Sequence, residues 1–130
     1  MLNEARTLKR LNHENIVEFK DYFVDVDEKS TQIYIIQEYC DGKYTKNALF
    51  SVLGGDLKQK LTDMKKKNLQ FSQEELWSYM LSVCIGMAHA HRKRVMHGDL
   101  TPSSVVFKQD RDDETEIPML KISGFGQEFK

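Results

Sequence analysis

The stretch of this chain with the clearest chemical content is HGDLTPSSVVF, at positions 97–107, followed downstream by SGFG at positions 123–126. It places Asp99 on a turn, where a carboxylate can accept a proton from a hydroxyl group. A metal site is the second interpretation, because one part of the chain holds three histidines and a cysteine: His89, His91, His97 and Cys84. No carboxylate–histidine pattern such as HExxH accompanies them, so we favour the first interpretation.

The two motifs, in this order, resemble the catalytic loop and the magnesium-binding loop of eukaryotic protein kinases of the serine/threonine type. The resemblance implies that Asp99 is the catalytic aspartate, which accepts the proton of the substrate hydroxyl. The family usually reads His-Arg-Asp-Leu-Lys-Pro-x-x-Asn and Asp-Phe-Gly at these places. This chain departs from that pattern at four positions, which are Gly98, Thr101, Ser104 and Gly124.

Three of these departures bear on catalysis. By the resemblance, Ser104 and Gly124 stand where the family has its magnesium ligands, and Thr101 replaces the lysine that steadies the γ-phosphate. Loss of one preorganised electrostatic contact typically costs ~10²–10³ in rate. We therefore expect negligible kinase activity, poor binding of magnesium and at most weak binding of ATP. Gly98 replaces the arginine that gathers a phosphorylated activation loop, which implies no switch of that kind.

The resemblance also assigns residues to nucleotide binding. The stretch NEARTLKRLNHENIVEF is similar to the αC helix and the following strand, and Glu4 takes the place of the αC glutamate. Its usual partner is an upstream lysine, and the sequence begins too late to contain that lysine. The stretch IIQEYCDG is similar to the segment joining the two lobes, with Gln37 as gatekeeper and Glu38 to Cys40 offering backbone groups to an adenine. Val106 would lie under that adenine.

An apolar column is the part of the family pattern that the chain retains. The resemblance implies that four side chains stack to join the two lobes: Leu8, Phe19, His97 and Phe125. A chain that keeps this column but lacks metal and phosphate ligands resembles a pseudokinase, which acts as a scaffold or regulatory partner. Two alternatives stay open, an active ATP-dependent kinase whose termini are missing from the sequence and a non-functional gene remnant.

Periodicity predicts an α+β fold of one domain, a partial protein-kinase-like fold. The expected elements are helices at 2–11, from Asp56 and after Ser72, strands at 16–24 and 32–37 flanking DVDEKS, and a hairpin of 105–107 with 119–122. By the resemblance, 1–37 belongs to the small lobe, 38–42 is the hinge and 55–130 belongs to the large lobe.

Side-chain patterns predict how two of these helices lie. After Ser72, the residues expected to form one apolar stripe packed in the core are Leu76, Trp77, Met80, Leu81, Cys84, Met87 and Ala88. A basic run on the preceding helix is expected to be a solvated face; it comprises Lys58, Lys60 and 65–67.

Residues 43–54, KYTKNALFSVLG, interrupt the family pattern as a probable insertion. Without them EYCDG would join GDLKQKL, a typical hinge and αD start. The edges Gly-Lys-Tyr and Leu-Gly match what split splice-junction codons would encode. The segment is either a retained intron in the gene model or a genuine surface loop.

Composition limits the remaining function classes. The chain has 130 residues, with 19 basic and 20 acidic ones, so bulk charge does not favour nucleic acid or a membrane surface as partner. It has no CxxC spacing and no apolar run of ~20 residues. The N-terminus becomes charged at once, unlike a signal peptide. We expect a reduced, soluble protein that is cytoplasmic or otherwise intracellular, and exposed apolar surfaces that favour a protein partner.

Overall fold

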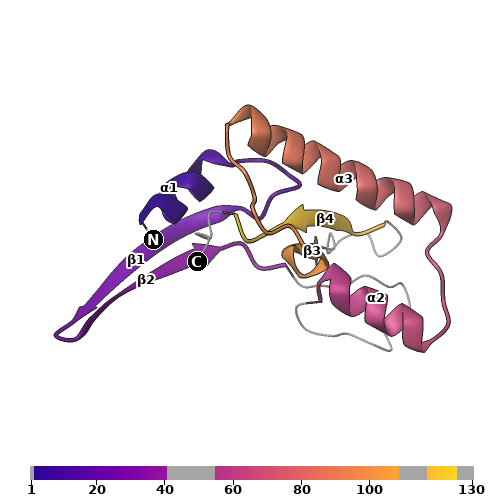
Figure 1. Ribbon diagram of the computed structural model, residues 1–130, viewed down its shortest axis with the longest axis horizontal. Helices are drawn as coiled ribbons and strands as arrows, with labels where there is room; N and C mark the ends of the chain where they lie inside the picture. The colour runs from indigo at the N-terminus through magenta and orange to yellow at the C-terminus, as the bar shows by residue number, and fades with distance from the viewer. Residues whose placement is uncertain (1, 41–54, 109–116, 126–130) are drawn as a thin grey trace.

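The computed structural model describes residues 2–40, 55–108 and 117–125 (Figure 1). The elements, in order, are α1 (Leu2–Arg10), β1 (Phe19–Asp27), β2 (Ser30–Gln37), α2 (Leu57–Lys66), α3 (Gln73–Arg92), a 3₁₀ turn (Pro102–Ser104), β3 (Val105–Lys108) and β4 (Met119–Ile122). Two antiparallel two-stranded sheets, β1–β2 and β3–β4, combine with three helices. The predicted α+β class is confirmed. The segment 43–54 lies outside the described residues.

The first hairpin is longer at its tip than the sequence predicts. The ladder extends through Val26 opposite Thr31 to Asp27 opposite Ser30, so most of the predicted acidic link is strand. The tip projects away from the helices (Figure 1), where acidic side chains stay hydrated while their backbone groups pair across the ladder. The predicted start at Ile16 is also wrong, because Ile16 forms an isolated parallel bridge with Ile122 of β4.

Helices α2 and α3 begin at side-chain caps. The Asp56 carboxylate accepts a hydrogen bond from the backbone N–H of Gln59 at 2.9 Å. Ser72 and Glu75 form the capping box that the sequence predicts, each side chain accepting from the other's backbone N–H. These caps satisfy donors that the first turn of a helix leaves unpaired.

Two buried clusters form the core, and β4 contributes a residue to each. The first joins α1, the end of α3 and the C-terminal turn: Leu8, Leu11, Ile16, Ala90, Val95, Ile122 and Phe125. The second joins α3 to the hairpin β3–β4: Tyr79, Val105, Phe107 and Leu120. The predicted apolar column is confirmed, because Phe19 packs against the first cluster and the His97 ring meets the Phe125 ring edge-on at 4.6 Å.

The predicted packing of α3 is wrong for most of its apolar stripe. The side chains of Leu76, Trp77, Met80 and Leu81 are 45–64% exposed, and Cys84 is exposed as well. The buried side of the helix is instead the one that carries Tyr79, Gly86 and Ala90. Gly86 explains the choice, because a Cβ there would meet Ile122 Cδ1 at 2.9 Å and only glycine lets the helix approach β4 so closely.

Lys60 also departs from its predicted place on a solvated face. Its side chain is 3% exposed, and its ammonium group contacts the Glu75 carboxylate at 3.0 Å and the Tyr79 hydroxyl at 2.7 Å. The rings of Phe71, Tyr79 and Phe107 lie around the ammonium group at 4.8–5.4 Å. Burial lowers the pKa of Lys60, and Glu75 acts against that shift. Lys60 thus joins α2 to α3 instead of facing water.

Two further findings concern the described ranges. None of their helices is both long and apolar enough to cross a membrane. The two cysteines, Cys40 and Cys84, are not joined in a disulfide.

Candidate functional site

The loop that carries Asp99 is held by His97. The His97 side chain is buried, and its Nε2 lies 2.7 Å from the carbonyl oxygen of Ser123. Its Nδ1 accepts the backbone N–H of Asp99 at 3.3 Å, which places the ring proton on Nε2 as donor to Ser123. Gly98 has φ +85°, a left-handed conformation that suits glycine. The Asp99 side chain is exposed at this turn.

The two predicted magnesium-ligand positions lie beside this loop. Ser104 Oγ donates to the carbonyl oxygen of Asp99 at 3.1 Å, and the Ser104 carbonyl accepts the backbone N–H of Ser123 at 2.7 Å. Gly124 follows Ser123 with φ +81°, and a Cβ there would lie 3.7 Å from the His97 ring. The structure therefore brings Asp99, Ser104 and Gly124 into one neighbourhood through backbone contacts. Thr101, whose backbone N–H points to Ser104 Oγ at 3.4 Å, completes the turn.

The residues predicted to meet an adenine lie at the junction of β2 and the hairpin β3–β4. Gln37 ends β2 and is half-buried, as are Cys40 and Val106. Val106 pairs with Lys121 across the hairpin, and Lys121 binds Glu38, so Glu38 and Val106 share one face of that hairpin. Their roles toward a nucleotide stay predictions.

Glu4 lies on α1, and its side chain is outside the part of the molecule that the structure describes. Its predicted role as the αC glutamate therefore stays a prediction.

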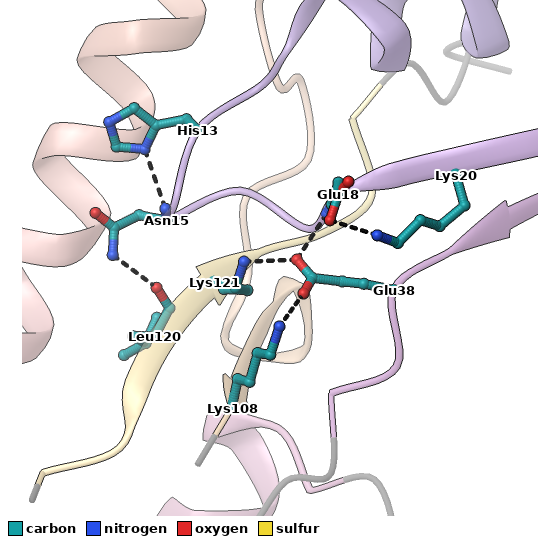
Figure 2. Close-up of polar contacts among 8 residues, drawn as sticks. All are labelled: His13, Asn15, Glu18, Lys20, Glu38, Lys108, Leu120 and Lys121. Carbon is teal, nitrogen blue, oxygen red and sulfur yellow. Dashed lines mark hydrogen bonds and ion pairs between the residues drawn. The ribbon is translucent and has the colours of Figure 1, made fainter. Parts of the chain in front are cut away.

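The side chain of Glu38 forms the strongest electrostatic cluster at this junction, which Figure 2 shows. Its carboxylate is 5% exposed and contacts Nζ of Lys108 and Nζ of Lys121, each at 2.5 Å. It also accepts the backbone N–H of Glu18 at 2.8 Å. Burial alone would raise the pKa of Glu38, but these hydrogen bonds outweigh burial and lower the pKa to about 2. The group stays ionised and ties the junction to β3 and β4.

Sequence reasoning did not find this cluster, because only the backbone of Glu38 was expected to matter. A signal for it was present: Lys121 interrupts the apolar strand MLKI, and its side chain is only 8% exposed. A lysine in a buried strand needs a nearby carboxylate.

Two of the histidines considered for a metal site, His89 and His97, make other contacts. Within the described ranges, no group of three or more His, Cys, Asp or Glu side chains could hold a metal ion. His97 is engaged by Ser123 and Asp99, and the His89 ring packs on the His13 ring at 4.8 Å.

Comparison with known proteins relates this geometry to a family. The family description "Protein kinase domain" matches residues 1–128. Serine/threonine-protein kinase Nek3 of Mus musculus is 33% identical over 95% of this chain and 19% of its own length. Probable serine/threonine-protein kinase nek2 of Dictyostelium discoideum is 24% identical over 97% of this chain and 26% of its own. Serine/threonine-protein kinase Nek11 of Homo sapiens is 28% identical over 95% of this chain and 15% of its own. The chain thus spans about a quarter or less of these relatives.

Proposed function

Because this chain belongs to the protein kinase domain family, related to the serine/threonine kinases, we propose that it is a catalytically defective member acting as a scaffold or regulatory partner. One observation carries the proposal. At the turn where the family binds magnesium, Gly124 has no side-chain ligand, and neighbouring Ser104 offers only one neutral hydroxyl oxygen.

The family implies magnesium and ATP, and the residues present do not fit the metals. Magnesium takes six oxygen ligands in near-octahedral geometry, mainly carboxylates, phosphates and water. Of the three positions around the site, only Asp99 offers a carboxylate. Ser104 offers one neutral hydroxyl oxygen, and the side chain of Gly124 offers none. We therefore derive no catalytic step through a bound metal.

Asp99 retains the geometry of a proton acceptor without the charge neutralisation that phosphoryl transfer needs. Its backbone is fixed by His97, and its side chain is exposed to an incoming hydroxyl group. Phosphoryl transfer depends mainly on positioning and on cations that neutralise the phosphate. The residues at 101, 104 and 124 are all uncharged. The reaction is thus expected to be slower by at least ~10²–10³ than in a complete site.

The second part of the proposal is that the chain binds ATP at most weakly and without a metal. The backbone N–H of Glu38 donates to the carbonyl oxygen of Glu18 at 2.9 Å, so we do not expect this group to contact an adenine. Val106 remains half-buried beside this junction. We expect any stabilisation by ATP to be small and independent of magnesium.

A thermal-shift titration with ATP, with and without magnesium, tests the proposal. The wild-type chain is expected to show no magnesium-dependent shift. The double variant Gly124→Asp with Ser104→Asn is expected to gain one, because it restores both ligand types. The φ of +81° at position 124 would strain any residue other than glycine, but aspartate is enriched among the non-glycine residues found at positive φ, and its Cβ would make only ordinary contacts with His97.

The opposite outcome would support an active kinase whose remaining parts lie outside these 130 residues. Magnesium-dependent stabilisation of the wild-type chain, together with phosphate transfer to a serine peptide that Asp99→Asn abolishes, would overturn our proposal. The retained aspartate and its His97 contact favour this second candidate. A gene remnant is the third, and absence of the protein from cells that carry the transcript would favour it.

A further inference from the structure

Two histidines, here called the histidine contact, join the loop after α1 to α3. The His13 ring lies against the His89 ring, with the centroids 4.8 Å apart and the planes tilted by 39°. Nδ1 of His13 also accepts the backbone N–H of Asn15 at 3.0 Å. Asn15 in turn binds β4, because its Nδ2 donates to the Leu120 carbonyl and its own carbonyl accepts the Ile122 N–H. Figure 2 shows the path from His13 through Asn15 to Leu120.

The hydrogen bond between His13 and Asn15 requires a neutral His13 ring. Nδ1 accepts a hydrogen bond only while it carries no proton, and in the charged imidazolium both ring nitrogens are donors. Protonation of His13 at Nδ1 would therefore set a second donor against the Asn15 N–H. The side chain of Asn15 is buried, so the loop would lose one of the bonds that orient this residue toward β4.

His89 favours the neutral form for a different reason. Its Nε2 is buried, and no residue in the described part of the chain gives this atom a hydrogen-bond partner. An imidazolium would bury a charged N–H there without an acceptor, which costs free energy. Because this chain already covers the atom, any further segment could reach it only by displacing the residues around it.

The charges around the histidine contact also oppose protonation. Burial lowers the pKa of His89, and three basic groups lower it further: His13 from the loop, and Lys93 and Arg92 from the end of α3. Arg10 adds a positive charge from α1, since its guanidinium group donates to the Lys93 carbonyl at 3.0 Å. The carboxylate of Glu14, next to His13 in sequence, is exposed, so water screens its charge.

We propose that the histidine contact is proton-sensitive: it holds the loop after α1 on α3 and β4 while both rings are neutral, and it weakens when either ring is protonated. A histidine kept neutral by folding contributes its full stabilisation above the unfolded pKa of about 6.5, and the contribution is lost as pH falls below that value. Acidification from about pH 7.5 to 5.5 should therefore loosen α1 and the first hairpin from α3. This range lies above the one in which Glu38 titrates, and the inference does not depend on nucleotide binding.

Urea unfolding of the 130-residue chain at pH 7.5 and 5.5 tests the proposal. His89→Phe keeps a ring against His13 but has no group to protonate, and it gives up no hydrogen bond at the buried Nε2. The unfolding equilibrium constant of wild type should rise several-fold more on acidification than that of His89→Phe, with ~10-fold as the limit for one histidine kept neutral by folding. His91→Gln is the matched control, because His91 is exposed on the same helix, and it should keep the wild-type pH dependence.

A second variant separates the hydrogen-bond acceptor from the charge. His13→Asn replaces the ring by an amide that does not titrate and whose oxygen can accept the N–H two residues on. Amide hydrogen exchange followed by NMR gives a local readout. In wild type at pH 5.5, the N–H groups of Asn15 and Ile122 should lose more protection than that of Glu38, which donates to the Glu18 carbonyl. In His13→Asn the three groups should keep their relative protection.

Three outcomes would overturn the proposal. They are equal pH dependence of unfolding in wild type and His89→Phe, loss of the pH dependence in His91→Gln, and an equal loss of protection at all three amides of wild type. If His89→Phe does not fold, the comparison of wild type with His13→Asn at the two pH values decides.

Discussion

Replacing Glu38 by glutamine is expected to lower the free energy of unfolding by about 3 kcal/mol at pH 7. The substitution keeps the shape of the side chain and removes its charge. It therefore breaks the ion pairs with Lys108 and Lys121 while the backbone N–H of Glu18 can still be accepted by the amide oxygen. The change in the free energy of unfolding therefore measures the electrostatic contribution of the Glu38 cluster.

The magnitude follows from two independent considerations. The pKa of Glu38 falls from its ordinary value of 4.5 to about 2, and each unit of such a shift corresponds to about 1.4 kcal/mol. Removing one partner of a buried ion pair typically costs about 3–5 kcal/mol. Lys121 is 8% exposed and would be left buried without its carboxylate, whereas Lys108 is 44% exposed and would regain water. The cost should therefore lie at the lower end of that range.

The effect should depend on pH in a defined direction. A carboxyl group whose pKa is lowered by folding stabilises the protein above its unfolded pKa and loses this contribution as pH falls through its folded pKa. The difference between wild type and Glu38→Gln should therefore be constant above pH 5 and shrink between about pH 4.5 and 2.

Urea unfolding followed by far-UV circular dichroism, at several pH values, measures both quantities. Glu18→Gln is the matched control, because its carboxylate pairs with Lys20 at the surface with both side chains about half exposed. That variant should change stability by less than ~0.5 kcal/mol. A loss below ~1 kcal/mol for Glu38→Gln, or a loss independent of pH, would refute the reasoning.

Two further substitutions probe the packing of α3. Gly86→Ala should destabilise by about 1–3 kcal/mol in the same urea assay, because the new methyl group overlaps Ile122 Cδ1 at 2.9 Å; a gain in stability would show that the helix can move away from β4. Lys60→Ala should cost about 2–4 kcal/mol, since it opens space between three aromatic rings and leaves Glu75 without its cation. Exposed Lys58→Ala should change stability by less than ~0.5 kcal/mol, and equal losses for the two lysines would contradict the buried role.

Local signals in the sequence predicted most of the elements. The capping box at Ser72, the helix after Asp56 and the hairpin of β3 with β4 were all predicted. These features depend on residues close together in sequence. Strand ends at the first hairpin were less well predicted, because the backbone ladder continues through polar residues that point to water.

Features that depend on tertiary contacts were not predicted from the sequence. Helix α3 is apolar on two sides, and periodicity alone does not indicate which side is buried; the absence of a side chain at Gly86 does. The buried ammonium of Lys60 depends on Glu75, fifteen positions away, and on three aromatic rings. Glu38 likewise meets lysines 70 and 83 positions away. Partners at such separations leave no periodic trace.

For the candidate site, the sequence predicted which residues lie together, but it did not predict the hydrogen bonds between them. The loop with Asp99, the serine at 104 and the glycine at 124 do lie together. The engagement of Ser104 Oγ with a backbone carbonyl was not predictable, because a hydroxyl group can turn toward either a ligand or the chain itself.

The seam between the loop after α1 and β4 has a consequence for the order of folding. Asn15 Nδ2 donates to the Leu120 carbonyl, and the backbone N–H of Ile122 donates to the Asn15 carbonyl, across more than a hundred positions. The chain loses conformational entropy when it closes so long a loop, and only then can this contact stabilise the fold. Synthesis runs from the N-terminus, so α1 and the first hairpin emerge long before β4 exists. Until β4 is made, Leu11 and Ile16 lack Ile122, one of the residues that complete their buried cluster, and they add apolar surface to the unfinished chain.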